Sequence, residues 1–460
     1  MRILKILAVV LAALALPAVL GAPTVASAFA ALNPPRTDAV SVTPAPPAYD
    51  PAKPTAVVVV GDRGAVVSDA LAPYEILATT GAFNVYSVAS EAHSVPLTGG
   101  LDLVPDLTFA ELEDLIGGPA DLVVVPAMPD VLQPSTRPVT DWLAAQADRG
   151  AVLLSVCNGA AVLASAGLLD GHEATAHWLR LQEWAQRFPA VEWMQGTRYV
   201  DDGAVITTAG ILSGIDGTLH AVERFVGADA AADAARAIGW PHHHPGAPAG
   251  MDQARLDASD AVVAFNSAFG WDRQRIGVLL TDGVGEIELA SVFDTYGQSL
   301  AARTVSLGDG PVQSRHGLTF VPRADSGVGL DRLVVPGTAE HDPVPGMDPP
   351  THPHHGPGFA YDGVLQDLAR TTDVATARWT AKVLEYPIDD LSLSGDAWPW
   401  AETFRPLALA ALGALLALGA FALVGRARGS AADRKPQVDR KPQVQPTAPP
   451  TARPIVPNGD

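Results

Sequence analysis

Residues 56–60 are an unbroken run of alanine and valine with no polar position. A strand with one face in water would alternate apolar and polar residues, so this run predicts a strand buried on both faces. Helical spacing follows over residues 68–80, and residues 84–89 have the composition of a second strand. Strands that alternate with helices predict an α/β layer structure around a parallel sheet.

The alternation continues to a distinctive turn. Residues 121–125 predict another buried strand, residues 139–148 a helix, and residues 151–156 a strand that runs directly into Cys157. The whole pattern predicts a doubly wound, mostly parallel sheet. A cysteine between a strand and a helix indicates a nucleophile elbow, which presents its side chain at the carboxyl edge of the sheet, where ligands of α/β proteins bind.

Cys157 is the only cysteine among the 460 residues. One cysteine excludes an internal disulfide and a thiolate-rich zinc site. A lone cysteine is commonly an inert buried thiol, but a following helix lowers the thiol pKa and offers backbone N–H groups to a developing anion. We therefore predict a reactive thiol, with Gly159 allowing the chain to turn sharply.

A second series of similar elements follows a Pro/Gly/His-rich junction at residues 240–271. The series comprises strands at 276–280, 302–307 and 333–335 and helices at 288–296 and 374–384. Two acids six residues apart mark both series: Asp69 with Glu75, and Glu288 with Asp294, shifted by 219 residues. This periodicity predicts an internal duplication.

The two copies would occupy residues 55–239 and 272–388. The second copy has no cysteine, so only the first can use thiol chemistry, and we expect the second to pack on the first as an intramolecular pseudo-dimer. Histidines cluster at residues 242–244 and 352–355. Imidazoles bind metals, but these clusters lie in Pro/Gly-rich segments without carboxylate spacing, which favours solvated linkers and no metal.

The N-terminal part carries a membrane signal. A basic start, an uncharged apolar stretch at residues 6–20 and a small-residue cleavage pattern at residues 26–28 predict a secretory signal over residues 1–31. An uncleaved anchor is the alternative. A Pro-rich spacer is expected at residues 32–54.

A second apolar segment lies near the C-terminus. Residues 407–424 carry no charge and basic residues follow, which predicts a transmembrane helix over residues 404–425 after a linker at 389–403. The positive-inside rule puts the Pro-rich, disordered tail at 426–460 in the cytoplasm and the main domains outside the cell membrane. The formal net charge of −20 argues against nucleic acid as a partner.

Five motifs follow one another in the first copy: residues 155–160 (SVCNGA), 163–171 (LASAGLLDG), 174–178 (ATAHW), 199–203 (YVDDG) and 208–216 (TAGILSGID). Together they resemble the ThiJ/PfpI family of class I glutamine-amidotransferase-like proteins, and most of all the amidotransferase-like domain of AraC-type regulators. The resemblance implies a flavodoxin-like or amidotransferase-like sheet. It covers residues 55–239 well and 272–387 in part.

The resemblance also implies roles for individual residues. Cys157 corresponds to the family nucleophile, His177 to its histidine partner and Asp69 to an acid that tunes the thiol. A carboxyl group beside a thiolate must be protonated or otherwise neutralised to help, because like charges oppose each other. Alternatively, Asp69 is a helix N-terminal acid favoured by the helix dipole, and His177 is a core imidazole.

Three neighbouring positions complete the predicted site. Relatives commonly have two glycines after the strand-ending proline, where a backbone N–H helps an oxyanion hole, whereas this chain has Ala127 and Met128. Met128 either narrows the pocket or only packs. Asn158 either orients a substrate or a water, or is a turn-forming asparagine.

The resemblance implies a cofactor-free, cysteine-dependent hydrolase or hydratase. Its substrate would be a small electrophile such as an amide, an isonitrile or a carbonyl compound. Two non-catalytic interpretations remain: a small-molecule sensor that signals through the membrane span, and a redox sensor that uses oxidation of Cys157.

Overall fold

The computed structural model describes residues 2–36, 42–243, 249–340 and 348–432. The predicted disordered tail lies outside the described residues from position 433 onward, as do short parts of the spacer and of the two histidine-bearing segments. The chain divides into two compact units. Residues 17–408 form the larger unit, and residues 1–16 with 409–460 form the smaller one.

The larger unit contains a seven-stranded sheet with the strand order β10-β11-β7-β6-β1-β2-β5. Its strands are β1 (Thr55–Val59), β2 (Asn84–Ala89), β5 (Leu107–Thr108), β6 (Leu122–Val125), β7 (Val152–Ser155), β10 (Tyr199–Asp202) and β11 (Val205–Thr208). All neighbours run parallel except β10 and β11. Every residue of β1 is buried, as its unbroken apolar run predicts. The predicted α/β fold with a mostly parallel sheet is therefore confirmed.

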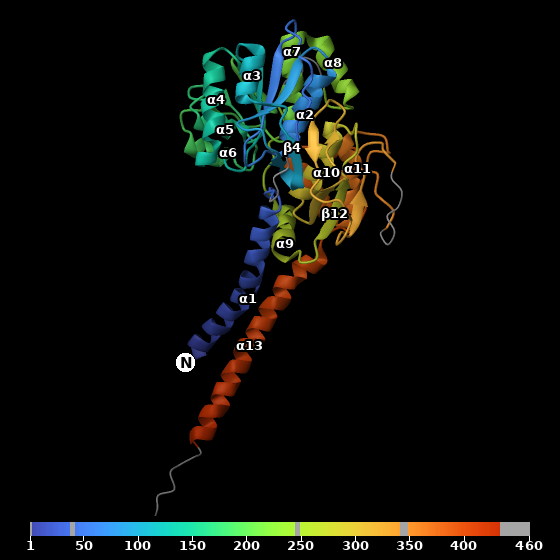
Figure 1. Cartoon of the computed structure of the whole chain (residues 1–460). Coiled ribbons are helices and arrows are strands. Elements are labelled where there is room, and N and C mark those ends of the chain that lie inside the picture. The colour runs from blue at the N-terminus through green and yellow to red at the C-terminus, as the bar shows by residue number, and fades with distance from the viewer. Residues whose placement is uncertain (1, 37–41, 244–248, 341–347, 433–460) are drawn as a thin grey trace, which may run out of the picture. The chain divides into compact units, whose positions relative to one another are not determined.

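Helices cover both faces of this sheet (Figure 1). One layer consists of α2 (Val67–Thr79), α7 (Ser213–Val226) and α8 (Ala228–Ala237), and the other of α3 (Phe109–Ile116), α4 (Arg137–Asp148), α5 (Gly159–Ser165) and α6 (Leu181–Arg187). Each layer closes a separate apolar core. The chain order reverses beside β1, so the carboxyl ends of β1 and β6 flank a topological switch point, where α/β proteins bind ligands.

The second part of the larger unit contains a smaller parallel sheet. Its parallel sheet has the order β13-β12-β16, so β12 lies between its neighbours as β1 lies between β2 and β6. The elements are β12 (Gln274–Leu279), α10 (Glu286–Gln298), β13 (Ala302–Leu307), β16 (Arg332–Val334), α11 (Ala360–Thr371) and α12 (Val374–Leu384). Each central strand is followed by a helix, and these two helices, α2 and α10, pack against each other.

Short elements join the two parts. A four-stranded sheet takes β3 (Val95–Leu97) and β4 (Leu101–Val104) from the first part and β14 (Val312–Gln313) and β15 (Thr319–Val321) from the second. The remaining elements are the pair β8 (Glu173–Ala174) and β9 (Glu192–Trp193) and the 3₁₀ turns η1 (Thr98–Gly100), η2 (Pro134–Thr136) and η3 (Ala258–Asp260). The shared sheet makes the two parts one folded unit.

Two reciprocal hydrogen bonds link α2 and α10. Ser68 N donates to Asp294 Oδ2 at 3.0 Å, and Ile287 N donates to Glu75 Oε2 at 2.6 Å. The two donors are 219 residues apart in the chain, and so are the two acceptors. Reciprocal contacts of this kind are what a two-fold axis between similar elements produces.

Two segments expected to be linkers are folded onto the unit. Within residues 240–271 lies α9 (Ala261–Phe269), where Asn266 Nδ2 donates to Thr376 Oγ1 on α12 at 2.8 Å. The Pro-rich spacer runs along β2, because the Asn84 side chain donates to the carbonyl oxygens of Asp50 and Lys53. Proline and glycine content marked these segments as irregular, but their polar backbone atoms and apolar side chains find partners on neighbouring elements.

Two helices are long and apolar enough to cross a membrane. They are α1 (Arg2–Ala30) and α13 (Trp400–Ala432), whose most apolar 18-residue windows have mean hydropathies of 2.7 and 2.5. Length and composition alone identify them, and a secretory signal near an N-terminus has the same properties.

Candidate functional site

Cys157 has a backbone conformation that is rare for a residue with a side chain. Its φ is +57°, in the left-handed region, directly after β7 and before α5. This conformation costs about 1–2 kcal/mol for a non-glycine residue, and it is the strained turn of a nucleophile elbow. Gly159 makes the turn fit, since a Cβ there would lie 2.0 Å from the carbonyl oxygen of Val125.

Asp69, in the first turn of α2, lies beside this thiol. The carboxyl group is fully buried, and its Oδ2 accepts a hydrogen bond from Ala127 N at 3.0 Å. Burial, and then the nearby charge of Asp294, raise the pKa of Asp69 well above its usual value, although the Cys157 thiol and the Ala127 N–H act in the opposite direction. Asp69 is therefore protonated more readily than an ordinary carboxyl group, and Oδ1, which has no conventional hydrogen-bond partner among the described residues, can carry the proton.

The Cys157 thiol is also held in its protonated form. It is 3% exposed, and this burial, followed by the charge of Asp69, raises the pKa of Cys157 well above its usual value. The hydrogen bond from the Asn158 N–H lowers the pKa of Cys157, but this effect is smaller than those of burial and of the charge of Asp69. The direction is opposite to the one expected for a cysteine before a helix, because desolvation of the thiolate outweighs the backbone N–H groups.

His177 has partners other than the thiol. Its Nε2 donates to the carbonyl oxygen of Val383 at 2.8 Å, and its Nδ1 accepts from Leu179 N at 3.2 Å. Both ring nitrogens are thus occupied by backbone groups in a neutral imidazole, and burial lowers the pKa of His177. The structure places His177 at the contact with the second part of the unit and gives it no hydrogen bond to Cys157.

Ala127, Asn158 and Met128, the other predicted site residues, make different contacts. The N–H of Ala127 is taken by Asp69, so Ala127 belongs to the site by holding the acid in place. The side chain of Asn158 accepts from Trp184 Nε1 at 2.8 Å and so anchors α6. Met128 is buried and packs closely on Gly61, where a Cβ would lie 3.0 Å from its sulfur.

Glu385, which no motif predicted, reaches the site from the second part of the unit. It follows α12 in a left-handed conformation, with φ of +54°. Its Oε2 accepts from Gly210 N and from Ser213 Oγ, both at 2.6 Å, while Oε1 is buried without a partner among the described residues. Its negative charge contributes to the raised pKa values of Cys157 and Asp69. The sequence offered one indirect signal, the helix predicted over residues 374–384.

One group among the described residues has the composition of a metal site. Glu75, Glu286 and His316 bring ligand atoms within 4.8 Å of one another. However, His316 Nδ1 lies 2.8 Å from Glu286 Oε2, and the guanidinium of Arg315 lies 3.1 Å from Glu75 Oε1. A positive charge in contact with the cluster opposes a second cation, so the group serves as an internal ion-pair network.

Comparison with known proteins identifies relatives of the first part of the chain. The model of the DJ-1/PfpI family matches residues 55–224. An isonitrile hydratase from Pseudomonas putida is 33% identical over 165 residues, which are 35% of this chain and 68% of that protein. The HTH-type transcriptional regulator GbdR from Pseudomonas aeruginosa is 30% identical over 139 residues, 30% of this chain and 36% of the regulator. A solved ThiJ/PfpI family protein from Pseudomonas syringae matches at 25% identity with a TM-score of 0.37, over 42% of this chain and 77% of that chain.

Proposed function

Because the chain belongs to the DJ-1/PfpI family, we propose that it is a membrane-tethered, cysteine-dependent hydrolase or hydratase. Its substrate would be a small electrophile such as an amide, an isonitrile or a carbonyl compound. The observation that carries the proposal is the strained Cys157 beside the buried Asp69, whose pKa is raised by burial. The relative named an isonitrile hydratase supports the hydratase alternative.

In this mechanism Asp69 moves protons while Cys157 forms the bond. Cys157 Sγ attacks the substrate carbon, and the Asp69 carboxyl gives its proton to the atom that gains the electron pair, which is the oxygen of an amide or carbonyl compound and the attacked carbon of an isonitrile. The thiol proton passes to the carboxylate, so that no buried carboxylate and thiolate coexist. With an amide, the C–N bond then breaks, the amine leaves with a proton from the Asp69 carboxyl, and water hydrolyses the thioester to restore the thiol. With an isonitrile or a carbonyl compound nothing leaves, and water takes the place of sulfur on the attacked carbon and restores the thiol. In this mechanism His177 transfers no proton, and its hydrogen bond to the carbonyl oxygen of Val383 joins the first part of the unit to the second.

The second part of the unit would complete the site as a degenerate copy of the first. The reciprocal bonds between α2 and α10 support the duplication. The end of α12 and the residue after it support the role in the site. Leu212 N donates to Leu384 O at 3.0 Å, and Val383 and Glu385 make the contacts described above. A neighbouring subunit would occupy this place in a dimer; here one chain supplies both halves.

A sensor without catalysis is the second candidate. The similarity to GbdR supports it, as does the burial of Cys157 beneath a packed second part. In that case the site would bind a small molecule or become oxidised, and α13 would carry the signal through the membrane.

Turnover and binding separate these candidates. The full chain in detergent micelles is incubated with an alkyl isonitrile, a primary amide and a small aldehyde, and product formation is compared in wild type, Cys157→Ala and Asp69→Asn. We expect turnover of one compound, abolished in Cys157→Ala and reduced at least tenfold in Asp69→Asn. Absence of turnover, together with saturable binding that survives Cys157→Ala, would establish the sensor instead.

Topology has its own test. The proposal puts the larger unit outside the cytoplasm and the tail inside, on the basis of the basic residues that follow residue 424. Protease added to intact cells should digest the larger unit and spare an epitope tag on the C-terminus. Protection of the larger unit would reverse the proposed orientation.

A further inference from the structure

A cavity of about 580 Å³ opens at the carboxyl edge of the seven-stranded sheet. Its walls come from the segments that follow β1, β2 and β6, together with residues 33–36 at the start of the spacer. The lining residues used below are Asn33, Arg36, Asp62, Arg63, His93 and Asp130. The size suits a small organic ligand. Cys157 does not line the cavity, and it follows β7, which lies two strands from β1, or about 10 Å at the usual strand spacing.

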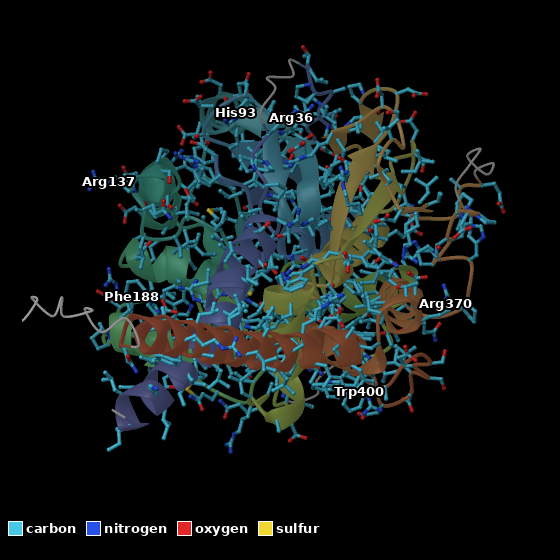
Figure 2. All side chains as sticks on the ribbon, turned by 90° about the horizontal axis from the view of Figure 1, so that it is seen from below. Arg36, His93, Arg137, Phe188, Arg370 and Trp400 are labelled. Atoms are coloured by element: carbon cyan, nitrogen blue, oxygen red, sulfur yellow. The ribbon has the colours of Figure 1, made fainter. Side chains whose placement is uncertain are left out.

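Two arginines and a histidine line the cavity beside two aspartates, Asp62 and Asp130, in a chain whose formal net charge is −20. Arg36, Arg63 and His93 all line it, and Figure 2 shows Arg36 and His93 on the same side of the larger unit. Arg36 is held in place by Asp102 at 2.7 Å. The side chains of Arg63 and His93 have no hydrogen-bond or ion-pair partner among the described residues. The side chains of Arg63 and His93 can therefore donate hydrogen bonds to a bound anion beside Arg36.

Two residues that line the cavity have buried acceptor oxygens without a partner among the described residues. Asp130 is 4% exposed, and its Oδ2 accepts from Ser135 Oγ, while Oδ1 is buried without a partner among the described residues. The amide oxygen of Asn33 is likewise buried and unpaired there. A buried acceptor without a donor costs about 1–3 kcal/mol, so a ligand that brings a donor is favoured.

We propose that this cavity is a binding site for a small organic anion that also carries a hydrogen-bond donor. The anion, a phosphate or a carboxylate, pairs with Arg36, Arg63 and His93, and a hydroxyl or ammonium group donates to Asp130. One oxygen of Asp62 is already engaged within the chain, because Oδ1 accepts from Ser90 Oγ at 2.6 Å. The site acts independently of the thiol.

Calorimetric titration of the full chain in detergent micelles tests the proposal. The probes are glycerol 3-phosphate and glycerate, each compared with its simple anion, inorganic phosphate or acetate, and ethanolamine as a donor without an anion. We expect one of the first two to bind at least tenfold more tightly than its simple anion, and ethanolamine not to bind. The better of the two probes identifies phosphate or carboxylate as the preferred group.

Variants tie the binding to the cavity. Arg63→Ala should weaken binding of the better probe at least tenfold, whereas Arg137→Ala, an exposed arginine outside the cavity, should not. Asp130→Asn should cancel the advantage over the simple anion, because an amide N–H₂ would replace the free acceptor. Cys157→Ala should bind as wild type does, so loss of thiol chemistry leaves this result intact. No binding by either probe, or equal affinity in Arg63→Ala and wild type, would overturn the proposal.

Discussion

Replacing Glu75 by Gln should remove a pH dependence from the stability of the contact between the two parts of the larger unit. Glu75 is 4% exposed, and its two oxygens accept from Ile287 N at 2.6 Å and from Arg315 Nη1 at 3.1 Å. Burial, and then the charge of Glu286, raise the pKa of Glu75 from 4.5 to about 7. The opposing effects of the Ile287 N–H, Arg315 and His316 are smaller.

The size of the effect follows from the two pKa values. Glu75 binds its proton more tightly in the folded chain, so its contribution to stability is fully present below pH 4.5 and is lost as the pH rises through 7. At about 1.4 kcal/mol per pKa unit, the total loss is about 3 kcal/mol, and about 2.5 kcal/mol of it falls between pH 5 and pH 8. A glutamine imitates the protonated acid, keeps an acceptor for Ile287 N and contributes no such slope.

Unfolding of the full chain in micelles, followed between pH 5 and pH 8, measures this contribution. Wild type should lose about 2.5 kcal/mol more stability over this range than Glu75→Gln, while Glu192→Gln, at an exposed position, should behave as wild type does. Asp294 and Asp106, whose pKa values are each raised by burial to about 6, add the same slope to all three proteins. Equal slopes in wild type and Glu75→Gln would refute the reasoning, since Glu75 would then titrate alike in the folded and unfolded chain.

Two glycine substitutions test the geometry of the site. Gly159→Ala would place a Cβ 2.0 Å from a carbonyl oxygen and force the elbow apart, so alkylation of Cys157 by iodoacetamide should change at least tenfold, whereas Gly118→Ala, with open space around it, should leave the rate unchanged. Gly210→Ala would place a Cβ 2.2 Å from Glu385 Cδ and displace that carboxylate. Because the charge of Glu385 raises the pKa of Cys157, the pH profile of alkylation should then move to lower pH; an unchanged profile would show that Glu385 does not act on the thiol.

Local patterns were sufficient for the main strands and helices and for the elbow, but not for α9, which lies in a segment expected to be a linker. The strand β2 and the helix α12 begin and end where the apolar runs predicted, because a strand buried on both faces excludes polar residues and a helix buries one face. The elbow was predictable as well, since a small residue at position 159 is a local requirement of a tight turn. The sequence also showed the equal spacing of the two pairs of acids, Asp69 with Glu75 and Glu288 with Asp294. It did not show that Glu75 and Asp294 accept hydrogen bonds from the backbone of the other part.

By itself, then, the sequence determined the main strands and helices, their order and the position of the thiol, because these depend on neighbours a few residues away. Only the tertiary structure decided the chemistry around the thiol. Burial raises the pKa of Cys157, a backbone carbonyl 206 residues away occupies His177, and Glu385 comes to the site from the second part of the unit. Desolvation and long-range hydrogen bonds depend on which surfaces pack together, and no local pattern around residue 157 or residue 385 records that packing.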